Sequence, residues 1–135
     1  MSKSLLYRIF GAGKFSHEII SQLESESLTL IDEGIKASVT FKNFKSPGRR
    51  SSWRRNFFTA SIALTGTRLF AQAFSKKIID VPLTDERIQL INFDLMPKGG
   101  LLLTFDAGLF QEKWSGTIEY RFHTELAKDF YDKLA

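Results

Sequence analysis

The side chains that could perform acid–base or metal chemistry are scattered along this sequence. His17 and His123 stand near opposite ends of the chain, and neither has the spacing of a zinc-protease helix or a neighbouring nucleophile serine. The aspartates at positions 80, 85, 94 and 106 lack the spacing of a calcium loop. Cysteine is absent, which excludes disulfides, thiolate catalysis and cysteine-bound zinc. We therefore expect a protein that is not an enzyme and that uses no metal and no cofactor.

A glycine-containing run, Gly11–Lys14, has the letters GAGK. A phosphate-binding loop needs an earlier glycine and a hydroxyl residue after the lysine, whereas Phe15 follows here. We interpret this run as a hinge.

The residues best suited to bind a ligand are six cations in a stretch without any acidic residue. They are Lys42, Lys45, Arg49, Arg50, Arg54 and Arg55. Arginine offers a planar fork of donors to phosphate oxygens, and several cations on one loop concentrate a positive field. The stretch predicts binding of an acidic membrane, a phosphorylated headgroup or an acidic protein partner. The same composition is also expected of a hairpin loop whose charge only keeps it soluble and blunts its edge.

The overall charge of +4 is uneven along the chain. Residues 1–60 contain 10 basic and 5 acidic side chains, and residues 61–135 contain 9 and 10. A basic face attracts anions such as phosphates and acidic lipids.

Nucleic acid is the less favoured partner. Trp53, Phe57 and Phe58 could stack on bases. However, the aromatic pattern of an RNA-recognition sheet is missing, and alternation makes Phe58 a core residue.

Most of the sequence alternates between apolar and polar residues, which predicts antiparallel strands. Seven strands are expected, at residues 35–44, 54–64, 68–74, 79–83, 91–95, 101–105 and 118–122. In the first of these, Lys36, Ser38, Thr40 and Lys42 should form a solvent-exposed face. Pro47 and Gly48 start a turn, and residues 49–52 are expected to continue as a loop.

Helical spacing is confined to the two ends. A short amphipathic turn is expected at residues 5–10, a helix at residues 16–26 and a short apolar lead-in strand at residues 28–31. A final helix should start at Thr124 as its N-cap and run to residue 134. The expected fold is mainly β (α+β): a seven-stranded antiparallel partly open barrel or orthogonal sandwich, capped by a C-terminal helix, with an extra N-terminal helix. Residues 1–33 would be an extension and residues 34–135 the domain.

Part of this order resembles a known family. The pairs Leu64-Thr65 and Arg68-Leu69 and the segment Val81–Leu83 are similar to the bacterial PH-like and GRAM branch of the pleckstrin-homology superfamily. Residues 53–58 (WRRNFF) resemble the basic-aromatic start of the second strand of that family, and residues 118–135 resemble its last strand and helix. The resemblance implies a PH-like domain whose first hairpin, with the six cations, would bind an anionic headgroup.

The leading interpretation is therefore a non-enzymatic PH-like binding module. The alternatives are a protein-interaction or assembly domain without a lipid ligand, and a small-molecule-binding barrel or small enzyme. Leu109, Phe110 and Trp114 are a candidate apolar patch, although the favoured interpretation is that this loop folds onto the core. No apolar run approaches the ~20 residues that cross a bilayer. We expect a cytoplasmic protein, at most peripheral at the membrane, and the oligomeric state stays open.

Overall fold

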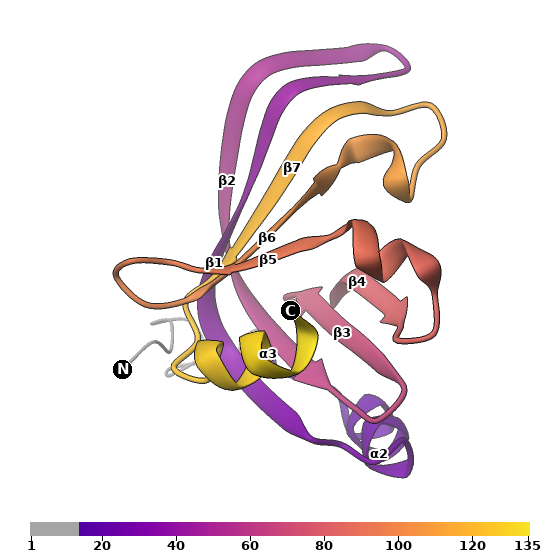
Figure 1. The fold of residues 1–135 in the computed structure, drawn as a ribbon, viewed down its shortest axis with the longest axis vertical. Coiled ribbons are helices and arrows are strands. Elements are labelled where there is room, and N and C mark those ends of the chain that lie inside the picture. Colours follow the sequence, from indigo (N-terminus) through magenta and orange to yellow (C-terminus); the bar gives the residue numbers. More distant parts are fainter. Residues whose placement is uncertain (1–13) are drawn as a thin grey trace.

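The fold is a curled β-sheet flanked by two helices (Figure 1). A computed structural model of the chain describes residues 14–135, so the expected turn at residues 5–10 and the glycines at positions 11 and 13 lie outside the described residues. The helical elements are α2 (His17–Ser25), η1 (Glu86–Leu90), η2 (Ala107–Leu109) and α3 (Ala127–Leu134). The strands are β1 (Leu30–Ser46), β2 (Arg49–Leu64), β3 (Arg68–Ala73), β4 (Lys76–Pro82), β5 (Asn92–Leu95), β6 (Leu101–Asp106) and β7 (Ser115–Phe122).

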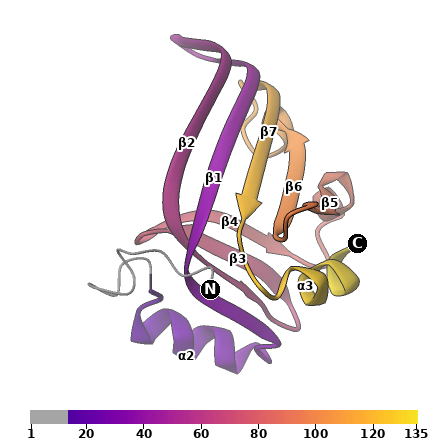
Figure 2. The same ribbon diagram turned by 90° about the vertical axis from the view of Figure 1, so that its left-hand side faces the viewer.

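All seven strands belong to one antiparallel sheet with the order β4-β3-β2-β1-β7-β6-β5. Strands that are consecutive in the sequence also pair in the sheet, except that β4 and β5 lie at its two opposite edges, and β7 closes the order by pairing with β1. The sheet curls into a half-barrel, and α3 packs against β5 and β6 on its concave side (Figures 1 and 2). The expected mainly β fold with seven antiparallel strands and a C-terminal helix is confirmed at this level.

The first hairpin is longer than the sequence pattern predicts. Residues 49–52 were expected to form a loop, but the ladder continues until Ser46 pairs with Arg49. The turn itself contains only Pro47 and Gly48, and Gly48 has a φ of +75°. Proline followed by a glycine with positive φ suits a tight turn, so the strands can pair up to its edges. The loop prediction for residues 49–52 is therefore wrong.

β1 is also longer at its start. Residues 28–31 were expected as a separate lead-in strand, yet β1 begins at Leu30 and runs through position 34 with one register shift between Asp32 and Ile35. At this bulge Gly34 adopts a φ of +72° and donates its N–H to the Ser61 hydroxyl over 3.1 Å. A left-handed residue lets the strand bend without ending.

The concave face carries the main core, and its alternation is as predicted for Ile35, Ala37 and Val39. The opposite face of β1 was expected to be wet, but Ser38 is 2% exposed and Thr40 is 0% exposed. Thr40 is covered because the Arg55 and Arg121 side chains from the two neighbouring strands both donate to its hydroxyl. A central strand has neighbours on both sides, so its polar face can be covered by their long side chains.

The two helices cover opposite faces in one half of the sheet. Phe15 and Leu23 pack on Ala63 and Phe70 on the convex side, and α3 buries Phe130 in the concave core. Figures 1 and 2 show both helices at the lower end, with the β1–β2 hairpin rising away from them. The upper half of the sheet therefore has no α-helix on either face among the described residues.

α3 starts later than expected. Thr124 was predicted to be its N-cap, but the N-cap position is Leu126, which makes no side-chain cap. The Thr124 hydroxyl instead accepts the Leu126 N–H over 3.1 Å and donates to Asp32 over 2.6 Å. Thr124 thus ties the turn before α3 to β1, and the helix begins only after that turn.

The turn into β7 gives a test of the hairpin packing. Gly116 has a φ of +104°, and a Cβ added there would lie 2.5 Å from the Asn43 carbonyl oxygen. Gly48 also has a positive φ, but a Cβ there would meet nothing within 4 Å. Gly48→Ala should lower the free energy of unfolding by about 1 kcal/mol, and Gly116→Ala by about 3 kcal/mol, because the backbone must also move. Urea denaturation of both variants measures the difference, and equal losses would show that β7 does not approach β1 this closely.

Candidate functional site

The candidate site is the distal hairpin, which we define as residues 42–55 at the upper end of β1 and β2 (Figure 1). β7 pairs with β1 as far as Lys45. β3 pairs with β2 only from Ala60 onward, so β2 has an open edge beside the distal hairpin. The hairpin is therefore supported on one side and free on the other.

The six predicted cations do not converge on one pocket. Lys42 forms an ion pair with Glu119 at 3.1 Å, and the Arg55 Nε donates to the Thr40 hydroxyl over 2.8 Å. Arg54 directly precedes Arg55 on β2 and so points to the opposite face of the sheet. Its guanidinium lies 4.6 Å from the centre of the Phe41 ring. These three cations already have partners within the protein.

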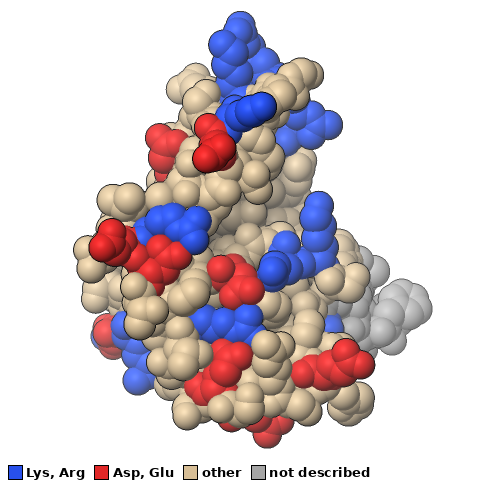
Figure 3. All heavy atoms as spheres, turned by 90° about the vertical axis from the view of Figure 1, so that its right-hand side faces the viewer, with Lys and Arg blue, Asp and Glu red and all other residues tan. Residues whose placement is uncertain are grey.

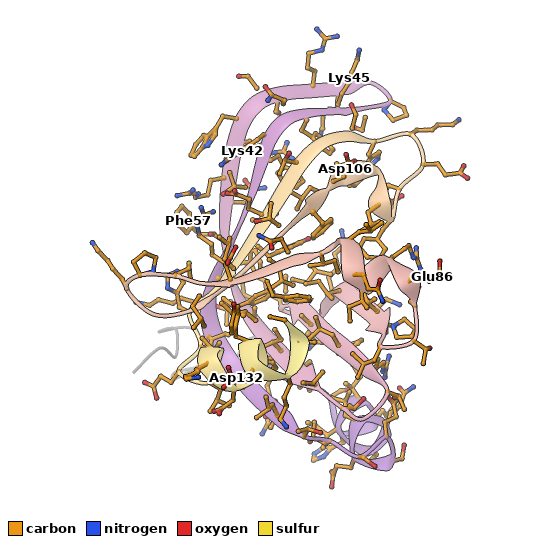
Figure 4. The ribbon with its side chains drawn as sticks, viewed as in Figure 1. Lys42, Lys45, Phe57, Glu86, Asp106 and Asp132 are labelled. Atoms are coloured by element: carbon orange, nitrogen blue, oxygen red, sulfur yellow. The ribbon has the colours of Figure 1, made fainter. Side chains whose placement is uncertain are left out.

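The other three cations gather at the tip of the hairpin. Lys45, Arg49 and Arg50 are exposed and have no ion pair among the described residues. Lys45 and Arg50 are direct cross-strand partners. In Figure 4 Lys45 points away from the body of the molecule. Like charges directly opposite on a sheet are destabilising, and an anion bound between them would remove that repulsion.

Two exposed aromatic side chains lie on the same strand. Trp53 is 57% exposed and Phe57 is 78% exposed, whereas Phe58 faces Tyr120 in the core. Figure 4 shows Phe57 on the outer side of the sheet, on the same side as Lys42. The sequence analysis considered Trp53 and Phe57 only for base stacking. Their alternation with the core residue Phe58 is the signal that places both on the outer face.

One acidic residue organises the polar side chains below the tip. Glu119 of β7 contacts Lys42, and its other oxygen lies 3.1 Å from the Arg121 guanidinium. Burial raises the pKa of Glu119, but the hydrogen bond and charge of Lys42 together with the charge of Arg121 outweigh it and lower the pKa. Glu119 therefore stays ionised and leaves the tip cations without an acidic partner.

The charge distribution along the chain also leaves the hairpin tip without nearby acidic residues. No acidic residue occurs between Glu33 and Asp80, a segment that includes the whole hairpin. Figure 3 shows Lys and Arg at the end of the upper projection, with acidic groups below it. The field of the hairpin tip is consequently positive.

The predicted apolar patch folds onto the core, as the favoured interpretation had it. Trp114 meets Phe44 edge to face with ring centres 5.1 Å apart, and Phe110 meets Phe105 at 5.6 Å. Leu109 packs against the same core.

The side chains that could perform acid–base chemistry are held in separate local contacts. Asp80 pairs with Arg68 at 3.0 Å, Asp85 pairs with Arg87, and Asp106 accepts the N–H of Gly108. Burial, helped by the charges of Lys36 and Arg121, lowers the pKa of His123. Within residues 14–135 no three His, Asp or Glu side chains gather as a metal would require.

The described part of the chain also has no helix that combines the length and apolar character needed to traverse a bilayer. Searches against protein-family models, curated proteins and solved structures found no match to this chain.

The ionised Glu119 predicts a pH dependence. Its pKa in the folded protein lies below the ordinary 4.5, so its stabilisation is complete above that value and is lost as the pH falls through the folded pKa. Glu119→Gln should cost about 1 kcal/mol near neutral pH, and the cost should shrink as the pH falls through the lowered pKa of Glu119. Urea midpoints measured across this range test it. Glu112→Gln, at an exposed residue, is the control, and a cost for Glu119→Gln that stays constant with pH would contradict the assignment.

Proposed function

We propose that this chain is a non-enzymatic PH-like module that docks on an anionic membrane surface through the distal hairpin. The PH-like part of the proposal is supported by the strand order, in which the first four strands and the last three meet where β1 pairs with β7, and by the C-terminal helix on the concave side. A peripheral position on a cytoplasmic membrane surface accords with this function.

The observation that carries the proposal is the joint exposure of cations and aromatic rings on one projecting hairpin. Lys45, Arg49 and Arg50 form its tip, and Trp53 is exposed three residues further along β2. The Arg55 guanidinium lies 5.1 Å from the centre of the Trp53 ring, yet Trp53 stays largely exposed. An exposed tryptophan near the unpaired tip cations suits a partner that is both negatively charged and partly apolar. The headgroup region of an acidic bilayer has both properties.

The physical chemistry of the two residue types is complementary. Each Lys or Arg close to an anionic surface contributes ~1 kcal/mol, and the attraction decays within a Debye length of ~8–10 Å. Because the tip projects from the body, its three cations can come within that distance together. Tryptophan favours the boundary between headgroups and acyl chains, so Trp53 would hold the hairpin there after charge has brought it close.

A second candidate function, assembly with another protein, is favoured by the open edge of β2. Within the described residues, positions 49–58 pair with β1 on one side only. An open edge can accept a strand from another chain. A dimer that persists at high salt in light scattering, without vesicle binding, would support this candidate.

The membrane proposal predicts a specific effect of the tip cations. Lys45→Ala/Arg49→Ala/Arg50→Ala should lose about 3 kcal/mol of binding, roughly a hundredfold in partitioning, to vesicles containing phosphatidylserine at low salt. Co-sedimentation measures it. The control Lys98→Ala/Lys128→Ala/Lys133→Ala removes the same charge from the β5–β6 turn and α3 and should retain most of the binding. Equal losses in the two variants would contradict a hairpin site.

The position of Trp53 at the membrane gives a separate prediction. The chain contains two tryptophans, so Trp53 is the only one left in Trp114→Phe. Its emission should shift to shorter wavelength on acidic vesicles and should be quenched by lipids brominated on the acyl chain. Co-sedimentation without any change in this emission would show that the hairpin does not enter the interface.

A further inference from the structure

A groove on the concave face has no part in the docking proposed above. It encloses about 530 Å³ in the upper half of the curled sheet, and β4 forms one of its sides. Its aromatic wall includes Phe41, Phe105, Phe110, Trp114 and Tyr120. Figure 3 looks onto the open side of the half-barrel, where the surface is hollowed below the projecting hairpin. A volume of this size lies within the range of roughly 300–1,000 Å³ typical of small-molecule sites.

The groove exists because the capping helix covers only part of the concave face. α3 contacts β5 and β6, and its buried side chains are Ala127 and Phe130. Neither lines the groove, whose walls come from β1, β4, β6, β7, the connection after β6 and Ile91 before β5. The apolar surface above α3 is therefore left without a helix to cover it.

Tyr120 lines the groove, and its hydroxyl makes no hydrogen bond to any described residue. Its ring stacks between Phe105 and Phe122. Burial raises the pKa of Tyr120 to about 12, so the hydroxyl stays protonated and can donate. A phenol that lines a groove and lacks a partner can donate to an oxygen of a bound molecule.

The charges at the rim are mainly positive. Lys76 and Lys77 border the groove, and Lys76 has no ion pair among the described residues. Lys77 reaches Asp80 only at 3.5 Å. Asp80 also borders the groove, and its carboxylate is held by Arg68 at 3.0 Å, although Arg68 is shared with Glu26 at 2.8 Å. An apolar groove with lysines at its mouth is complementary to a molecule with an apolar body and an anionic end.

We propose that this groove binds a single-chain amphipathic carboxylate of the long-chain fatty acid class. The acyl chain lies along the aromatic wall formed by Phe105, Phe110 and Trp114. The carboxylate pairs with Lys76 and Lys77 at the rim. This site is independent of the distal hairpin, so one can be lost without the other.

The two tryptophans separate the sites in an experiment. In Trp53→Phe the only tryptophan is Trp114, which lines the groove. Dibromostearate, titrated below its critical micelle concentration, should quench Trp114 with a saturable curve. In Trp114→Phe the remaining Trp53 should be quenched little. No saturable quenching of Trp114, or equal quenching of the two tryptophans, would overturn the proposal.

Charge reversal at the rim tests whether the carboxylate of the bound fatty acid lies there. Lys76→Glu/Lys77→Glu should weaken dibromostearate binding at least tenfold and leave the binding of the corresponding brominated alcohol unchanged. Lys98→Glu/Lys133→Glu changes the net charge equally at two other exposed lysines and should have little effect. Equal binding of dibromostearate to the two charge variants would overturn the assignment of the carboxylate to the rim.

A last experiment distinguishes this site from the proposed membrane-docking site. Lys45→Ala/Arg49→Ala/Arg50→Ala should keep its affinity for dibromostearate while it loses binding to acidic vesicles. If this variant loses both, the fatty acid is bound at the hairpin and the groove proposal is wrong. Thermal unfolding followed by circular dichroism confirms that each variant is folded before its binding is compared.

Discussion

The whole architecture depends on the pairing of β1 with strands on both of its sides. β1 is 17 residues long, and it joins β2 to β7, so it holds the first four strands and the last three in one sheet. A long antiparallel sheet twists, and with the bulge at Asp32–Ile35 it curls instead of staying flat. Curling creates a concave face that must be covered, and the length of α3 decides how much of it is covered. The groove is the part that eight helical residues do not reach.

The two ends of the sheet have different supports. At the lower end Arg68 joins Glu26, which follows α2, at 2.8 Å, and the Gly66 N–H is shared by two carbonyls at the end of the helix. At the upper end, polar side chains on adjacent strands stabilise one another through Thr40 and Glu119. Both surfaces to which we assign a function lie at this upper end. The helices thus fix the lower half and leave the upper half free to make contacts with other molecules.

Sequence reasoning predicted those features that depend on residues close together in the chain. Period-two alternation located seven strands, because each strand shows its buried face within a few residues. It could not predict that Thr40 is buried, because the Arg121 side chain that covers it comes from 81 residues further along. It could not separate Lys42 from the tip cations either, since the pairing with Glu119 spans 77 residues. Alternation alone could have placed Arg54 and Arg55 on opposite faces. The groove had no local signal, because it combines Phe41, residues 76–81, Ile91 and residues between 103 and 120.

The two-residue turn at Pro47-Gly48 also bears on how this protein can change over evolution. No other strand extends past the tip, so two residues can be added to each arm at once without disturbing the pairing below it. Adding a single residue to one arm would turn every side chain beyond it to the other face. Natural variants with a longer hairpin are therefore expected to differ by steps of four residues, which would extend the reach of the cations while the sheet beneath stays the same.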